Sequence, residues 1–101
     1  MKECCKTYLF GQFGDEDIVA EIYGEYVSSL SEKLAECDAA LASGDWVALD
    51  RAAHAMKGNA LAAGDTDMAE NAIALRSAGK LQDRENAATI IQVLKKLSTL
   101  L

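Results

Sequence analysis

The sequence predicts an all-α protein: an antiparallel up-down four-helix bundle with a short N-terminal cover segment. Half of the 101 residues are hydrophobic, many of them alanine, and there is no proline, a composition that favours helices packed through small side chains. Apolar residues also recur every three or four positions along four segments. The links between these segments are short, so consecutive helices should lie antiparallel. We expect a single domain over 1–101, with residues 1–14 as cover and the bundle over about 15–101.

Residues 1–14 mix apolar and polar side chains, and two glycines interrupt them. We expect a loop or a short helical piece whose aromatic side chains pack on one end of the core. A long helix should follow, with Asp15 as its N-cap and Gly44 just past its end. Its predicted core stripe is Val19, Tyr23, Val27, Leu30, Leu34, Cys37 and Leu41, widened at the start by Ile18, Ile22 and Tyr26.

A second helix is predicted from the cap residue Asp45 to about Ala63, with Gly64 as its stop. Its core-facing stripe is Trp46, Leu49, Ala53, Met56, Ala60 and Ala63. Since each residue turns the helix by about 100°, His54 points well away from this stripe. The only histidine of the chain is therefore expected on the outer face.

The third helix should start within 65–67, where Asp67 and Glu70 have capping-box spacing, and Gly79 should end it. Its predicted inner face is Met68, Ala69, Ala72, Ile73 and Leu75. After a link over 80–82, Asp83 should cap the last helix. The inward positions of that helix are Ala87, Ile90, Ile91, Leu94, Leu97 and Leu101.

Charge and missing motifs exclude several functions. The net charge of −6 argues against nucleic acid and against anionic membrane surfaces, which both require a basic face. No apolar run is long enough to span a membrane, and no glycine-rich motif for ATP or a dinucleotide is present. The cysteines Cys4, Cys5 and Cys37 lack metal-ligand spacing, so we expect no metal site but free thiols in a reducing cytoplasm.

His54 has an unusual setting, with Lys57 three residues later and Gly58 four residues later on the same helix face. By position alone, a surface histidine without a role is the simpler interpretation. A neutral imidazole is nevertheless a nucleophile near pH 7, because its ordinary pKa is about 6.5. The lysine can balance the charge of a phosphoryl group on the ring. The glycine removes a side chain, so that another protein can approach closely.

The outer face around His54 also carries a candidate docking surface. Two apolar side chains, Val47 and Leu61, lie there where water is expected. The charged residues Asp50 and Arg51 share this face. Scattered surface hydrophobes are common, so the alternative is that these residues have no role.

The stretch His54-Ala55-Met56-Lys57-Gly58-Asn59-Ala60-Leu61-Ala62-Ala63-Gly64 resembles the signature of histidine-containing phosphotransfer (HPt) domains. That signature reads His-x-apolar-Lys-Gly, then a small polar residue, and a glycine ten residues after the histidine. Residues 41–46 resemble the helix–Gly-Asp–helix corner of the family, and the resemblance covers about residues 13–100. Two positions depart from it: Asn59 stands where serine is common, and Asp65 where a small or apolar residue is usual.

The resemblance implies a phosphoryl shuttle in a two-component phosphorelay. His54 would accept a phosphoryl group from the aspartate of a response-regulator receiver domain, or from a hybrid sensor histidine kinase, and pass it to another receiver. Lys57 would stabilise the phosphoryl charge and Gly58 would give clearance. The receiver would supply Mg²⁺, so the chain itself would need no cofactor. Such a protein is a phosphohistidine carrier with no ATP site, and not a kinase.

Two other functions remain open from the sequence. One is a non-catalytic four-helix module that binds a receiver and blocks or scaffolds it. The other is a structural bundle that dimerises through its long helix. The intact set of His54, Lys57 and Gly58 favours phosphotransfer, because a pure binder has no need of the imidazole.

Overall fold

The computed structural model describes all 101 residues, and it contains five helices and no strand. The helices are α1 (Glu3–Phe13), α2 (Glu16–Ser43), α3 (Trp46–Ala63), α4 (Thr66–Lys80) and α5 (Arg84–Ser98). The prediction of an all-α protein is thus confirmed. None of these helices combines the length and the apolar character that a membrane crossing requires.

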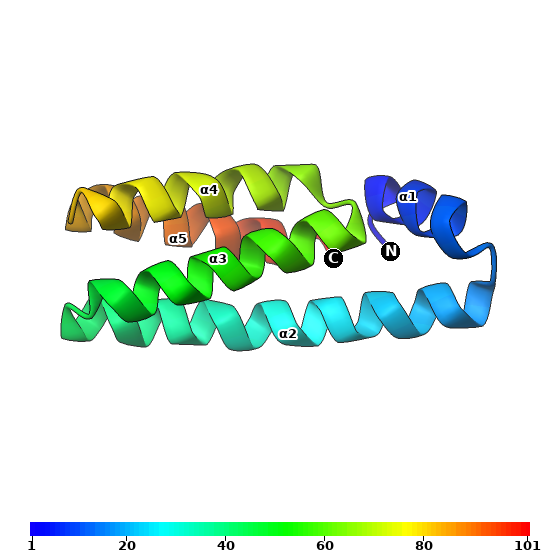
Figure 1. Ribbon diagram of the computed structural model, residues 1–101, viewed down its shortest axis with the longest axis horizontal. Coiled ribbons are helices and arrows are strands. Elements are labelled where there is room, and N and C mark those ends of the chain that lie inside the picture. Colours follow the sequence, from blue (N-terminus) through cyan, green and yellow to red (C-terminus); the bar gives the residue numbers. More distant parts are fainter.

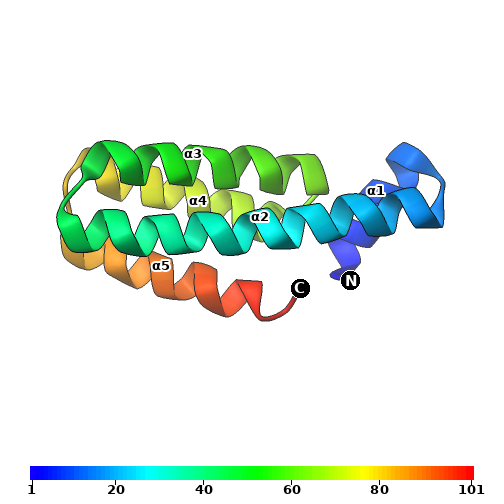
Figure 2. The same ribbon diagram turned by 90° about the horizontal axis from the view of Figure 1, so that it is seen from below.

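Helices α2 to α5 lie side by side along the long axis of the molecule (Figure 1). Each packs against the next, and α5 also packs against α2, so the four helices enclose one core. Helix α1 lies over the first turns of α2, beyond the ends of α3 and α4 (Figures 1 and 2). It contacts α2 and α3. The protein is therefore elongated, with extents of 42 × 20 × 18 Å.

Of the two predicted forms of residues 1–14, the structure has the short helix, α1, over Glu3–Phe13. Its contact with the core is made by Cys5 and Leu9, which are fully buried. The expected aromatic packing holds for Phe10, which lies against the core, and for Tyr8, whose partly exposed side chain packs closely on Gly64 at the end of α3. Phe13 remains substantially exposed, so the expectation was wrong for that residue. The helix ends at Gly14, whose left-handed backbone turns the chain into α2.

Most predicted helix ends are confirmed. The side chains of Asp15, Asp45 and Asp83 accept hydrogen bonds from backbone N–H groups in the first turns of α2, α3 and α5. Gly44 and Gly64 adopt left-handed backbone at the ends of α2 and α3, a conformation that glycine adopts without steric cost. Local sequence signals therefore set these boundaries.

Helix α4 begins at Thr66, within the predicted range, but its capping residue and its C-terminal end differ from the prediction. Its N-cap is Asp65, which accepts from the N–H of Met68, while Asp67 lies inside the first turn. Gly79 does not end the helix, which continues to Lys80. A Cβ at this buried glycine would meet the Leu49 side chain at 3.5 Å. Because that distance is an ordinary van der Waals contact, Gly79 is simply a buried residue inside α4 that packs against α3.

The core contains 23 buried apolar residues contributed by all five helices. The predicted stripes account for most of them but omit the buried alanines Ala40, Ala52 and Ala78. Ile18 and Ile73 were expected inside and are exposed. Trp46 is only half-buried, and the guanidinium of Arg84 lies 5.8 Å from the centre of its ring. The stripes therefore had the correct helical phase, but their edges included exposed residues and left out buried alanines.

A buried polar cluster joins α1 to the rest of the molecule. The Asp65 side chain is fully buried and accepts from the Lys2 ammonium at 2.6 Å and from the Tyr26 hydroxyl at 2.7 Å. The Lys2 backbone N–H donates to the Tyr23 hydroxyl at 3.1 Å. Burial and the bond to Asp65 raise the pKa of Tyr26, so its hydroxyl stays a donor at any physiological pH. The carboxylate therefore ties α1 and α2 to the α3–α4 corner.

The thiols provide a test of how firmly α1 is seated. Burial raises the pKa of Cys5 and of Cys37 to about 12, whereas Cys4 is exposed. Both buried thiols stay protonated at pH 8, and only a thiolate is nucleophilic. We therefore expect Cys4 alone to react rapidly with the disulfide reagent DTNB at pH 8, and all three thiols to react in denaturant. In a Cys37→Ala variant, which leaves Cys5 as the only buried thiol, a second thiol that reacts as fast as Cys4 would mean that α1 opens readily.

Candidate functional site

His54 lies on the solvent-exposed face of α3. Its neighbours in sequence Ala53 and Met56 are fully buried on the opposite side. The periodicity of α3 causes this separation, since the apolar stripe directs the rest of the helix outward. The predicted placement of the imidazole on the outer face is confirmed.

Arg76 of α4 bridges two side chains of α3. Its Nη1 lies 3.1 Å from Nδ1 of His54, and its Nε donates to Oδ1 of Asp50 at 3.0 Å. Asp50 and His54 are one helical turn apart on the same face of α3. One guanidinium thus contacts both a carboxylate and the imidazole, and it fixes the ring from its Nδ1 side.

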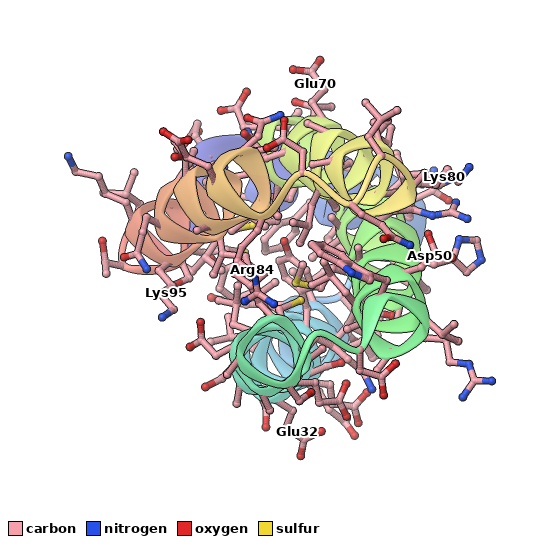
Figure 3. All side chains as sticks on the ribbon, turned by 90° about the vertical axis from the view of Figure 1, so that its left-hand side faces the viewer. Glu32, Asp50, Glu70, Lys80, Arg84 and Lys95 are labelled. Carbon is pink, nitrogen blue, oxygen red and sulfur yellow. The ribbon has the colours of Figure 1, made fainter.

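The charges around Asp50 favour its ion pair with Arg76. The hydrogen bond from Arg76 holds the pKa of Asp50 below its usual value, and the charges of Arg76 and Lys80 act in the same direction. Asp50 and Lys80 lie together on the side of the molecule formed by α3 and α4 (Figure 3). Asp50 is therefore an ionised anchor for Arg76.

Lys57 and Gly58 flank the histidine one turn further along α3. Lys57 is half-buried and takes part in none of the salt bridges of the protein, so its ammonium remains available for an incoming anion. Gly58 is exposed, and a Cβ built on it would meet no atom within 4 Å. The structure gives no packing reason for a glycine at this helical position, which leaves open space beside His54.

Apolar side chains are exposed on the same side of the molecule. Val47 is 64% exposed and Leu61 is 51% exposed, as their helical positions predict. Arg51 is also exposed. Asp50, in contrast, is engaged by Arg76, so it is not a free charge on this surface.

Two residues of this surface were missed by sequence reasoning. Ile73 had been assigned to the core, but it is 47% exposed, one helical turn before Arg76 on α4. A stripe drawn through Ala72, Leu75 and Gly79 would have placed both residues outside the core. No sequence signal, however, pairs Arg76 with a histidine 22 positions earlier, because that contact depends on how α3 and α4 pack.

The two departures from the HPt signature have structural roles away from the imidazole. The Asn59 side-chain amide donates to the hydroxyl of Ser29 at 2.9 Å, which joins α3 to α2. Asp65 is the buried N-cap of α4 described above. Both residues therefore stabilise the packing of α3 and do not alter the surface around His54.

A second group of potential metal ligands lies under α1. Donor atoms of Cys4, Cys5 and Asp65 come within 4.8 Å of one another, although the sequence spacing did not suggest it. The ammonium of Lys2 already contacts the Asp65 carboxylate and supplies the cation that this carboxylate requires. The cluster is thus accounted for by the buried ion pair.

The comparison with protein families agrees with this geometry. The family model described as Hpt domain matches residues 21–101, which include all of α3, α4 and α5 and most of α2. No curated protein and no solved structure matches this chain. The matched region contains His54, Lys57, Gly58 and Arg76. The chain therefore belongs to the Hpt domain family, whose members are histidine phosphotransfer modules of two-component signalling.

Proposed function

We propose that this protein is a phosphohistidine carrier of a phosphorelay, with His54 as the residue that is phosphorylated. The observation that carries this proposal is the exposed imidazole, which has cationic side chains beside it and open space over Gly58. An isolated carrier needs no nucleotide site, because the partner proteins bring the phosphoryl group. Receiver domains and a sensor kinase are the partners to be expected for a member of this family.

The transfer uses the ring nitrogen that is not engaged by Arg76. Because Nδ1 of His54 is on the side of the ring where Arg76, paired with Asp50, lies, the attacking atom is Nε2. It forms a bond to the phosphorus of an aspartyl phosphate on the receiver, and the bond from phosphorus to the carboxylate oxygen breaks. The carboxylate leaves with the electron pair of that bond, and the ring loses one proton to solvent. Mg²⁺ bound by the receiver offsets charge on the phosphoryl oxygens.

The rest of the molecule acts as the scaffold and the docking surface. Residues 1–101 form one functional unit, an antiparallel up-down bundle of α2 to α5 covered at one end by α1. The receiver would dock over α3 and α4, on the exposed apolar side chains of Val47, Leu61 and Ile73, with Arg51 at the edge. Apolar contact with a few charges suits a transient complex, where complementarity sets partner choice.

Replacement of His54 by glutamine tests the function directly. A receiver labelled with radioactive phosphoryl groups, mixed with the protein in Mg²⁺, should transfer label that is stable in alkali and labile in acid. The variant should take up no label, and its circular dichroism should be unchanged because position 54 is exposed. Labelling of the variant would exclude His54 as the acceptor. Receiver binding without any labelling of the native protein would instead identify a non-catalytic binding module.

A further inference from the structure

We propose that Arg76 is a latch on His54: while it is seated on Nδ1, the imidazole neither accepts nor releases a phosphoryl group through Nε2. The inference rests on the proposed function, and it adds a side chain that regulates the reactivity of His54. It follows from the fork in which one guanidinium spans Asp50 and His54 at 3.0 and 3.1 Å.

The chemistry of the guanidinium determines the state of the ring. Arginine has five N–H donors, no acceptor, and no neutral form in proteins. The ring nitrogen that faces it must therefore accept a hydrogen bond, so Nδ1 carries the lone pair. In a neutral imidazole the single proton then resides on Nε2. Seated Arg76 thus selects the Nε2–H tautomer of His54.

That tautomer is the wrong one for transfer. To attack phosphorus, Nε2 must offer its lone pair, which requires the ring proton to be on Nδ1. In the reverse direction the ring must leave as neutral imidazole, which again requires a proton on Nδ1 when the Nε2–P bond breaks. By microscopic reversibility, Arg76 must leave Nδ1 in both directions. A seated Arg76 also slows hydrolysis, in which water attacks phosphorus and the same imidazole leaves.

Asp50 gives the latch its second position. Its ionised carboxylate lies one turn from His54 on α3 and holds Arg76 through Nε. Once Nη1 has moved away, this carboxylate can accept a hydrogen bond from Nδ1–H, which keeps the ring proton on Nδ1 and leaves the lone pair on Nε2. Docking of a receiver, which brings its own charged groups against this face, supplies the attraction that draws the guanidinium off the ring, and Arg76 returns to Nδ1 when the receiver leaves.

Lys80 provides a matched control for Arg76. Both are cations of α4, one turn apart, and both lie near Asp50, but only Arg76 contacts the ring. The other charged groups of this face are Arg51 and Lys57 on α3. A change that depends on overall charge should therefore appear in both Arg76→Met and Lys80→Met, whereas the latch predicts a change in Arg76→Met alone.

The first measurement needs no partner. Because His54 is the only histidine, nitrogen NMR of protein labelled in histidine reports one imidazole. Above neutral pH the native protein and Lys80→Met should show almost only the Nε2–H tautomer, and Arg76→Met should show a mixture of both. The proposal is overturned if the native ring is already a mixture, or if Arg76→Met keeps the native tautomer.

The second measurement is the lifetime of the phosphorylated protein after removal of the receiver. Arg76→Met should hydrolyse about tenfold faster, the change expected for loss of one charge-assisted hydrogen bond, and Lys80→Met should match the native protein. Equal lifetimes of all three proteins would overturn the latch. If the native protein takes up no label at all, the proposed function fails, while the NMR result still decides the state of the ring.

Discussion

Replacement of Asp65 by alanine is expected to destabilise the protein by about 3–5 kcal/mol, the range for a buried ion pair that loses one partner. The substitution removes the N-cap of α4 and leaves the buried Tyr26 hydroxyl without its acceptor. It also leaves the Lys2 ammonium, which is mostly shielded from water, without its carboxylate. Urea unfolding followed by circular dichroism measures the change, and the transition midpoint should fall accordingly.

Asp83→Ala is the matched control for this prediction. Asp83 caps α5 in the same manner, through a hydrogen bond from the N–H of Asn86, but it is exposed and has no buried partners. Loss of an exposed cap costs about 1 kcal/mol. If Asp65→Ala costs no more than Asp83→Ala, the buried cluster contributes nothing beyond capping. Asp65→Asn should fall between the two, because the amide oxygen keeps one acceptor and loses the ion pair.

Gly58→Glu is expected to reduce phosphotransfer by on the order of 100-fold without destabilising the bundle. The added side chain lies one turn from His54 and carries a negative charge where a phosphoryl group must approach, and like charges brought together in an interface cost several kcal/mol. The fold should tolerate it, because a Cβ at this position meets no atom within 4 Å. Replacing a glycine within a helix should even stabilise it by about 0.5–1 kcal/mol. Transfer rates from a phosphorylated receiver test the predicted loss of activity, and the midpoints of urea unfolding test the predicted stability.

Gly24→Glu separates proximity from the substitution itself. Gly24 is also an exposed glycine within a helix, and its Cβ would likewise meet no atom within 4 Å. It lies in α2, however, far along the chain from the histidine. We expect native transfer rates for Gly24→Glu and an intermediate loss for Gly58→Ala, which adds bulk but no charge. Native rates for Gly58→Glu would show that open space beside His54 is not required.

Most of the helix boundaries could be predicted because their causes are local. An aspartate that caps a first turn and a glycine that turns left-handed act on groups within four residues. The errors arose where a contact between residues far apart in the sequence decided where a helix ends or whether a side chain is buried. Gly79 has the signature of a helix end, but it is buried against Leu49 of α3 and the helix continues to Lys80. Ile73 fits an apolar stripe, but α4 turns it to solvent.

The sequence by itself determined the acceptor and its immediate setting. His54, Lys57 and Gly58 lie within five residues on one helix, so helical periodicity alone places them on one outward face. Only the tertiary structure brought Arg76 to the ring and Asp65 beneath α1, since both contacts join segments far apart in the chain. Local periodicity directs a side chain toward solvent or core, whereas the partner it meets depends on how the helices pack.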